Sequence, residues 1–370
     1  MLNIVWFHGL PEYRSRICGF ERKGLTPYNH SSMTVTVRSF AKINLGLRIG
    51  PARPNGFHEL LTVYQTIGLH DIIRVRVMRG TVRVPEIEIR CADPRVPRDE
   101  SNSCYRVVEK AMAALRAKGR VIVDIEKRLP VQGGLGGAST NAVATLLGLE
   151  RALRKMLPAA ERLRIAAEVG SDLPLFLVGG SVLGVGRGEQ VYPLQDFPAT
   201  ACVVLTPEIG VSTPKAFAEW DRLCGASAPV LENFASHKLT AASPSDRMVE
   251  LSHGLSAWLS GLYSSAPSEF VERGGRAGNP LLRLDRAGIE NDFEQVVFPE
   301  YPKLGEAKRA LVRAGAKYAS LSGSGSTLYG LFVSREAAAS AVSKLRKAGW
   351  AAQATMTLTR AAYWRRMFAG

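Results

Sequence analysis

The stretch that decides the fold is KRLPVQGGLGGASTNAVATLLGLE, residues 127–150. A β-rich run at 121–125 leads into it, and its turn, residues 133–137, reads Gly-Gly-Leu-Gly-Gly. The apolar residues behind the turn share one stripe of a helix: Ala142, Leu146, Leu149 and Leu153. The order therefore predicts a strand, a glycine-rich turn and a long apolar helix in direct succession.

The turn predicts a binding site for a phosphate chain. Glycine allows a positive φ and a close approach to the backbone amides, and Ser139 or Thr140 stands where a helix N-cap is expected. Unpaired amides and the positive end of the helix dipole attract anions. The pattern matches neither a P-loop nor a Rossmann fingerprint. A flexible connection is the alternative, and so many glycines directly before a capping pair and an apolar helix disfavour it.

The composition is that of a globular protein with room for two domains. The chain has 370 residues, of which 46% are hydrophobic and 22% charged. Its five cysteines lie far apart without C-x-x-C spacing, which indicates reduced thiols in a cytosolic protein. No apolar run reaches the ~20 residues of a membrane helix, and residues 1–10 lack the basic region of a signal peptide. We therefore expect a cytoplasmic protein with no membrane partner.

The formal net charge is +15, from 48 Lys and Arg against 33 Asp and Glu. Such an excess is compatible with a nucleic-acid surface, a membrane surface or an anionic substrate. The basic residues come singly or in small groups rather than in one long block, which favours solvated faces over a nucleic-acid groove. Folding can still gather distant residues into one patch.

Shifts in composition predict the domain organisation. A strand pattern starts abruptly at Met33, and a boundary is expected near 196–200. One stretch is rich in Ala, Ser, Gly and Pro with a single convincing helix, 248–262, and is interpreted as a partly mobile insertion. The expected division is an N-terminal extension at 1–32, ordered or disordered, an N-terminal domain at 33–197, and a C-terminal domain at 198–370 with the insertion at about 225–288.

Periodicity predicts an α+β protein. The predicted strands are 39–49, 72–78, 82–90, 121–125, 201–205, 318–322, 328–333 and 351–358. The predicted helices are 103–118, 159–169, 303–314 and 335–347, besides the helix behind the glycine turn and the helix of the insertion. In the last third of the chain the order strand, tight loop, strand, helix, strand suggests an antiparallel sheet backed by helices.

The strand at 39–49 carries polar residues on one of its two faces. Isoleucines and leucines alternate on one face, while Lys42, Asn44 and Arg48 share the other. From this stretch alone, a solvated strand face is the simplest interpretation.

Two further sites hold candidate functional side chains. A turn at 54–58 exposes Phe57 beside His58, a pair that more often serves packing than recognition. Asp172 follows the helix at 159–169 and precedes a short apolar run. It is either the N-cap of a short turn or a catalytic residue, and spacing alone does not decide between the two.

Three separated motifs resemble those of one family, in the right order. The first is Ala41-Lys42-Ile43-Asn44-Leu45 followed by Gly56-Phe57-His58-Glu59-Leu60. The second is Leu129-Pro130 with the loop 133–142, and the third is Leu321-Ser322-Gly323-Ser324-Gly325. Between them, the segments 171–176 and 291–294 are similar to the family's catalytic-aspartate and N-D-x-E segments. The second motif is similar to that of GHMP kinases in general, and the first narrows the resemblance to the 4-diphosphocytidyl-2-C-methyl-D-erythritol kinases.

The resemblance implies a two-domain GHMP kinase fold, with an N-terminal ribosomal-protein-like domain and a C-terminal ferredoxin-like antiparallel sheet backed by helices. It implies ATP-dependent phosphorylation of the 2-hydroxyl of 4-diphosphocytidyl-2-C-methyl-D-erythritol in non-mevalonate isoprenoid synthesis. ATP and Mg²⁺ are the implied cofactors. The implied partner is a small molecule that carries a cytidine diphosphate group, with no nucleic acid, and the enzyme is expected to be a monomer or weak homodimer.

The resemblance also assigns roles to individual residues. Lys42 and Asp172 would be catalytic, with Asp172 accepting the substrate proton or orienting the hydroxyl. The residues expected to hold ATP are Pro130, Gly133, Gly134, Leu135, Gly136, Gly137, Ser139 and Thr140, with Ser139 or Thr140 also placing Mg²⁺. Those expected to bind the acceptor are Asn44, Phe57, His58 and Phe217, with aromatic rings stacking on the cytosine.

Two other functions compete with this one. Another GHMP kinase that acts on a small alcohol such as homoserine or mevalonate would share the glycine loop, but the Phe57-His58 pair argues against it. A non-catalytic RNA-binding protein would explain the ribosomal-protein-like domain and the basic charge. It would not explain why Lys42, Asp172 and two glycine loops occur together.

Overall fold

The computed structural model describes residues 33–54, 56–80, 85–225, 244–261, 279–284 and 288–368. The expected extension at 1–32 lies outside the described residues, as does most of the predicted insertion. Within the described ranges, no helix combines the length and the apolar character needed to cross a membrane.

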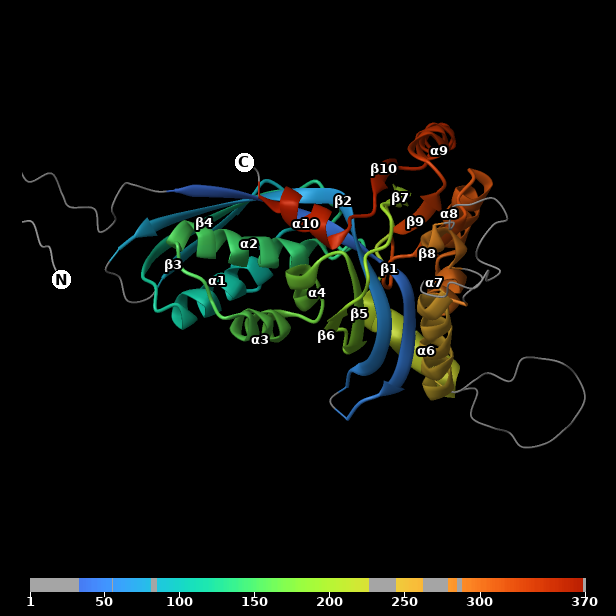
Figure 1. Cartoon of the computed structure of the whole chain (residues 1–370), viewed down its shortest axis with the longest axis horizontal. Helices are drawn as coiled ribbons and strands as arrows, with labels where there is room; N and C mark the ends of the chain where they lie inside the picture. The colour runs from blue at the N-terminus through green and yellow to red at the C-terminus, as the bar shows by residue number, and fades with distance from the viewer. Residues whose placement is uncertain are drawn as a thin grey trace, which may run out of the picture.

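The first half of the protein is a six-stranded sheet with helices packed against it (Figure 1). Its strands are β1 (Thr34–Ala52), β2 (His58–Arg79), β3 (Glu86–Cys91), β4 (Gly119–Glu126), β5 (Ser181–Gly186) and β6 (Gln190–Pro193). The order is β3-β4-β2-β5-β6 with β1 paired to β2, and only β3 and β4 run parallel among these pairs. The helices are α1 (Ser103–Ala114), α2 (Gly137–Leu153), α3 (Ala159–Val169) and α4 (Leu173–Val178).

The helix α2 is the centre of the first hydrophobic core. Its stripe of Ala142, Leu146, Leu149 and Leu153 is buried as predicted, and it packs on β1 and β2. Every residue from Thr140 to Glu150 is buried, because α1 and α4 also pack against the helix. Its first turn is therefore held rigidly at the end of the sheet, where the glycine turn ends.

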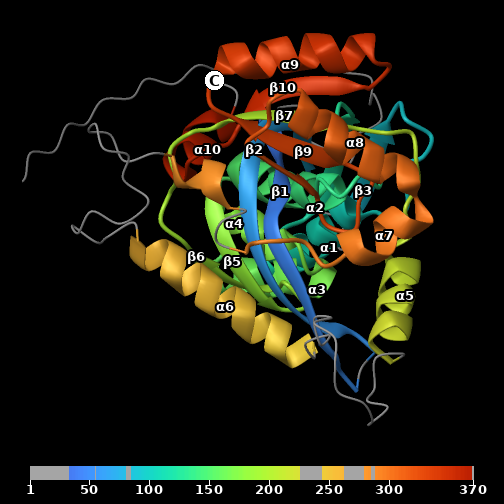
Figure 2. The same ribbon diagram turned by 90° about the vertical axis from the view of Figure 1, so that its right-hand side faces the viewer.

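The second half is a four-stranded antiparallel sheet backed by helices, as predicted. The strands are β7 (Ala201–Leu205), β8 (Tyr318–Leu321), β9 (Leu328–Phe332) and β10 (Ala352–Met356), in the order β10-β7-β9-β8. The helices that follow the chain here are α5 (Thr213–Gly225), α6 (Pro244–Gly261), the short 3₁₀ helix η1 (Pro280–Arg283), α7 (Glu294–Glu300), α8 (Pro302–Arg313) and α9 (Arg335–Lys347). Figure 2 shows α6 lying obliquely to the long strand β1, against which it packs, and Leu251 and Leu255 of this helix are buried.

The last helix, α10 (Arg360–Met367), returns to the first sheet. Tyr363 and Met367 are buried in the first core, and the hydroxyl of Tyr363 donates to the carbonyl of Phe176 at 2.7 Å. The chain thus crosses between its two halves a second time after β10. The periodicity did not predict α10, and the boundary expected near residue 197 stays a prediction.

Most predicted elements agree with the structure to within a few residues, with two clear exceptions. The strand predicted at 72–78 is only the last part of β2, which spans 22 residues and begins at His58. The helix predicted at 103–118 ends at Ala114, because Leu115 is its C-cap and Arg116 adopts a positive φ of 48°. A non-glycine residue in that conformation ends a helix, since the following residues cannot continue the ladder.

Candidate active site

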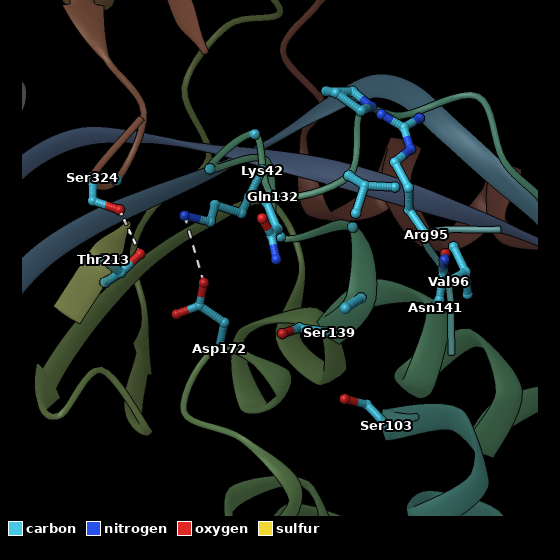
Figure 3. A pocket seen from close by; sticks show the side chains of 18 of the residues that line it. Lys42, Arg95, Val96, Ser103, Gln132, Ser139, Asn141, Asp172, Thr213 and Ser324 are labelled. Atoms are coloured by element: carbon cyan, nitrogen blue, oxygen red, sulfur yellow. Dashed lines mark hydrogen bonds and ion pairs between the residues drawn. The ribbon is translucent and has the colours of Figure 1, made fainter. Parts of the chain in front are cut away.

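A cavity of about 470 Å³ lies where glycine-rich loops from both halves of the chain meet (Figure 3). Its lining includes three basic side chains, Lys42, Arg95 and Lys127, and one carboxylate, Asp172. Lys42, Asp172 and Ser139 face one another at one end, while Arg95, Val96 and Ser103 line the other. Each cation is paired with a carboxylate, Lys42 with Asp172, Lys127 with Asp71 and Arg95 with Asp93. Cationic groups on a concave wall still favour an anionic ligand.

The first glycine loop is packed backbone to backbone against the second. The carbonyl of Gly133 accepts the amide of Thr327 at 3.2 Å, and that of Gly134 accepts the Ser322 hydroxyl at 2.9 Å. The carbonyl of Leu135 accepts the amide of Lys42 at 3.0 Å. Because the C=O and N–H of a trans peptide point in opposite directions, the amides of residues 134–136 point away from these partners. The loop is therefore preorganised with its donors on the side away from its packing contacts.

Glycine is required at two positions of this loop by space and conformation. Gly134 has a φ of +76°, and a Cβ there would collide with the carbonyl oxygen of Ser322. Gly136 has a φ of +70°, and a Cβ there would lie 2.9 Å from the Phe176 ring. The positive φ predicted for these glycines is confirmed, and the close neighbours seen here are the second loop and the Phe176 ring. The close approach of a ligand to the amides stays a prediction.

The predicted N-cap of α2 is wrong. The N-cap is Gly136, in the left-handed region and without a side-chain hydrogen bond, while Ser139 and Thr140 lie within the first turn. A side-chain cap would have occupied the first amides of the helix, which the glycine leaves without a side-chain partner. Ser139 lines the cavity, whereas Thr140 and Leu135 are each 1% exposed and do not line it.

Lys42 and Asn44 lie on a buried strand face, so the interpretation as a solvated face is wrong. Lys42 is 4% exposed, and its Nζ donates to Asn44 Oδ1 at 2.7 Å and lies 3.5 Å from Asp172 Oδ2. Asn44 is fixed in turn, since its Nδ2 donates to Thr62 Oγ1 at 2.8 Å. A buried cation is tolerated only with such partners. The lysine is thus aimed at the cavity beside a carboxylate.

Asp172 occupies the N-cap position of α4 but makes no capping hydrogen bond there. Its side chain, one third exposed, accepts the Tyr64 hydroxyl at Oδ1, 3.1 Å away, while Oδ2 faces Lys42. Burial, together with the negative charge of Asp172, raises the pKa of Tyr64 well above its ordinary value. The phenol therefore stays protonated and acts as a donor to the carboxylate.

The aromatic residues expected around a cytosine are arranged differently from the expectation. His58 stacks on Phe217, with ring centroids 4.8 Å apart and an interplanar angle of 13°. Its Nε2 lies 2.6 Å from Asp221 Oδ1. Phe57 is half exposed, with the Arg187 guanidinium 5.0 Å from its ring centre. Only Phe217 of the three lines the cavity, and one of its faces is covered by the imidazole.

The N-D-x-E segment holds the second glycine loop in place. Asn291 Nδ2 donates to the carbonyls of Leu321 and Gly323 at 2.9 and 2.8 Å. Glu294 accepts the amide of Leu321 at 2.9 Å. Beyond Gly323, the hydroxyls of Ser324 and Thr213 lie 2.7 Å apart on the cavity wall (Figure 3). This segment therefore acts through the loop rather than on a ligand.

Sequence reasoning missed a buried anchor of the first loop. Asp71 is fully buried, and its Oδ1 accepts the amides of Arg128 and Leu129, each at 2.7 Å. Its Oδ2 accepts Lys127 Nζ at 2.6 Å and Asn141 Nδ2 at 2.9 Å. One carboxylate thus ties the residues before the loop to the first turn of α2. Nothing local marks Asp71, which lies in a β-strand more than fifty residues before its partners.

The sequence also gave little sign of other cavity residues, namely Tyr64, Lys127, Thr213 and the segment 95–104. Lys127 was the most accessible to prediction, because it is a basic residue directly before the glycine loop. Tyr64 was not, since an aromatic residue in a strand ordinarily indicates core packing.

Both halves of the chain match models of known protein families. Residues 102–180 match the GHMP kinases N-terminal domain, and residues 273–350 match the GHMP kinases C-terminal domain. A 4-diphosphocytidyl-2-C-methyl-D-erythritol kinase from Solibacter usitatus is 37% identical over 308 residues, covering 81% of this chain and 82% of the relative. The chain belongs to the 4-diphosphocytidyl-2-C-methyl-D-erythritol kinase family.

Other members of this family and solved structures agree. The enzyme of that name from Geobacter sulfurreducens is 30% identical over 88% of this chain and 99% of its own length. The crystal structure of a 4-(cytidine 5'-diphospho)-2C-methyl-D-erythritol kinase superposes with a TM-score of 0.62 at 26% identity, covering 87% of this chain and 98% of that one. A homoserine kinase from Cytophaga hutchinsonii, 16% identical with a TM-score of 0.57, shares the fold alone. The GHMP kinase fold predicted from the motifs is confirmed.

Proposed function

We propose that this protein transfers the γ-phosphoryl group of ATP to the 2-hydroxyl of 4-diphosphocytidyl-2-C-methyl-D-erythritol, a step of non-mevalonate isoprenoid synthesis. The observation that carries the proposal is the pairing of Lys42 with Asp172, 3.5 Å apart, on the wall of a cavity that lies between two glycine loops and is lined by three basic side chains. Membership of the kinase family supports the same reaction.

The first glycine loop is suited to the phosphates of ATP. The amides of residues 134–136 point away from the second loop, and the start of α2 adds the positive end of a helix dipole. Lys127 contributes positive charge to this wall of the cavity, anchored by Asp71. Of the two hydroxyl residues predicted to contact ATP, we assign only Ser139 to this role, because Thr140 does not line the cavity.

The catalytic pair is suited to a transfer that depends on position and charge. In the reaction, the acceptor oxygen forms a bond to Pγ while the bond from Pγ to the leaving oxygen of ADP breaks. Lys42 would neutralise charge on the transferred group, and Asp172 would orient the acceptor hydroxyl and take its proton. Asn44 and Thr62 hold the lysine in line. A loose transition state places little demand on a strong base, so orientation is the larger part of this role.

The cytidine end of the acceptor is assigned to the surface around Phe57. Its ring is half exposed, and the Arg187 guanidinium lies over it, 5.0 Å from the ring centre. The next residue, His58, stacks on Phe217, and Asp221 fixes the imidazole through Nε2. The base would therefore stack on Phe57 and meet His58 at its edge, rather than lie between two phenylalanines.

Mg²⁺ fits this site as an ion shared with the nucleotide. Among the described residues, no three His, Cys, Asp or Glu side chains gather into a cluster that would hold a metal alone. Mg²⁺ commonly binds through one or two protein oxygens and the substrate phosphates. Ser139 would supply such an oxygen here, and the bound ion would neutralise phosphate charge.

The test is ATP turnover by the purified protein with three candidate acceptors. Turnover with 4-diphosphocytidyl-2-C-methyl-D-erythritol, but not with homoserine or mevalonate, supports the proposal. Turnover with homoserine or mevalonate alone would reassign the protein within the GHMP kinases. Salt-sensitive RNA binding without turnover of any acceptor would favour the non-catalytic alternative.

A further inference from the structure

The side chain of Tyr64 fits tightly in a narrow space between neighbouring backbone segments. It lies on β2 and is 2% exposed. Two glycines of the neighbouring strand and turn make room for it. A Cβ on Gly184 would lie 2.5 Å from Tyr64 Cε2, and a Cβ on Gly188 would collide with the hydroxyl. The position of the hydroxyl is therefore set by the walls around it.

The two oxygens of the Asp172 carboxylate have different partners. Oδ1 accepts the Tyr64 hydroxyl at 3.1 Å, and Oδ2 lies 3.5 Å from Lys42 Nζ. The same ammonium lies 5.6 Å from the centre of the Tyr64 ring. A carboxylate restrained at one oxygen has a fixed plane, and its second oxygen then has a fixed direction.

We propose that Tyr64 is a positioning residue of the kinase, holding Oδ1 of Asp172 so that Oδ2 faces Lys42 and the acceptor hydroxyl. The inference rests on the proposed role of Asp172 in phosphoryl transfer. It adds a group that would not bind either substrate through its hydroxyl, because that hydroxyl is already committed to the carboxylate.

The charged groups around Tyr64 and Asp172 determine what the loss of their hydrogen bond would change. Lys42 faces the carboxylate from β1, and Tyr64 faces it from β2. Glu189, in the turn between β5 and β6, acts on Tyr64 by its charge and accepts the amide of Arg187 at 2.6 Å. Of these groups, Tyr64 is the neutral donor to Oδ1. Removing its hydroxyl takes away a hydrogen bond that favours the ionised carboxylate and leaves its plane free to turn.

The experiment compares Tyr64→Phe with the wild type in steady-state kinetics across pH. We expect kcat to fall about tenfold, with the KM for ATP within about twofold of the wild type. We also expect the acid limb of the kcat profile to move to higher pH. The matched control is Tyr318→Phe, another buried tyrosine, whose hydroxyl donates to the carbonyls of Leu45 and Ile289. Its acid limb should stay in place, since it does not touch Asp172.

Two further variants separate a failure of the Tyr64 proposal from a failure of the proposed role of Asp172. Asp172→Asn tests the proposed role on which the inference rests, because full turnover in that variant would remove Asp172 from the mechanism. Loss of turnover in Asp172→Asn, with an unchanged profile in Tyr64→Phe, would overturn the inference alone. If Tyr64→Phe fails to fold, 3-fluorotyrosine at position 64 keeps the ring and donates a stronger hydrogen bond. It should move the acid limb to lower pH, and no movement would contradict the proposal.

Discussion

At the scale of single residues, the active site consists of polar groups that the fold buries and then partners. Lys42, Asn44 and Thr62 form a chain of hydrogen bonds within two adjacent strands, at the edge of the cavity. Leaving any of them unpartnered would cost a few kcal/mol, on the order of 1–3 per group. The last member of the chain, the lysine, faces Asp172, so its hydrogen-bond partners hold it beside the carboxylate.

His58→Ala tests the cytidine assignment. We expect the KM for the acceptor to rise about tenfold, because the variant removes the imidazole that packs on Phe217 and is fixed by Asp221. The KM for ATP should change little, and the measurement is steady-state kinetics with each substrate varied in turn. His70→Ala is the control, since its ring bonds to Gly68 in the first half of the chain and packs on Phe40. Equal effects of His58→Ala on both substrates would remove His58 from the cytidine site.

Asp71→Asn tests the anchor beneath the first loop. The amide would keep an acceptor for the two backbone amides but would present a donor to Lys127 and Asn141. We expect a loss of about 3 kcal/mol in the free energy of unfolding, as for other broken buried pairs, and a higher KM for ATP. Urea unfolding and ATP kinetics measure the two effects. Asp93→Asn removes an exposed pair with Arg95 and should leave stability nearly unchanged. Similar losses in both variants would contradict the account.

At the scale of elements, the glycine loops are one structure made of two segments. The first loop offers its carbonyls to the second, and the second is held by Asn291 and Glu294. The first loop has no space for a larger residue at Gly134, where a Cβ would collide with the Ser322 carbonyl oxygen. The geometry of this wall of the cavity therefore depends on both halves of the chain.

Gly134→Ala is expected to damage both stability and ATP binding. The new methyl group would collide with the Ser322 carbonyl, and φ is positive there, so we expect a loss of about 2 kcal/mol or more in the free energy of unfolding. Gly137→Ala is the comparison, because its φ is not in the left-handed region and its nearest neighbour is the end of the Lys127 side chain at 3.3 Å. Thermal unfolding of both variants decides, and equal shifts in Tm would contradict the packing argument.

The elements that the sequence predicted are those with long, regular apolar patterns. The helices α2 and α9 and the antiparallel sheet of the second half were all predictable from period and turn residues. The short helices α4 and α10 were not. The former is six residues long, and its apolar run fits a strand equally well. The helix α10 carries three arginines and buries only Tyr363 and Met367, so its apolar stripe is too narrow to detect.

The site was predictable where its residues lie in motifs and unpredictable where they meet across the fold. Alternation along β1 placed Lys42 and Asn44 on one face correctly, but it could not show that this face is buried. This face of β1 is covered by Asp172 and by the glycine loop, which lie about 90 to 130 positions further along the chain. The roles of Tyr64 and Asp71 could not be predicted for the same reason, because their hydrogen-bond partners are distant in the sequence.

At the scale of the whole molecule, the two halves are joined by contacts that cross between them in both directions. The last helix packs into the first core, and Tyr318 and Tyr329 of the second sheet donate to the carbonyls of Leu45 and Asn44 on β1. Burial raises the pKa of both tyrosines, and the same holds for Tyr363 and Tyr64. Four phenols are therefore kept neutral by the fold.

This burial predicts a loss of stability in alkali. In the unfolded chain a tyrosine ionises near pH 10, whereas the buried phenols stay protonated to higher pH. Their contribution to the free energy of unfolding is therefore fully present below about pH 9 to 10 and is lost as the pH rises further. Four such groups give a slope that approaches about 5 kcal/mol per pH unit. Cys104, whose pKa burial raises to about 12, acts in the same direction. Urea unfolding at a series of pH values measures the slope, and a constant free energy of unfolding between about pH 9 and 11 would contradict it.

The central claim is that Asp172 and Lys42 perform phosphoryl transfer to the 2-hydroxyl of 4-diphosphocytidyl-2-C-methyl-D-erythritol in the cavity between the glycine loops. The most direct test is turnover of ATP with that acceptor by the wild type and by Asp172→Ala, together with calorimetric binding of both substrates to each protein. We predict that the wild type turns over and that kcat in the variant falls at least about a hundredfold, while both substrates still bind. Wild-type rates in the variant would contradict the catalytic assignment, and no turnover by the wild type would contradict the proposed substrate.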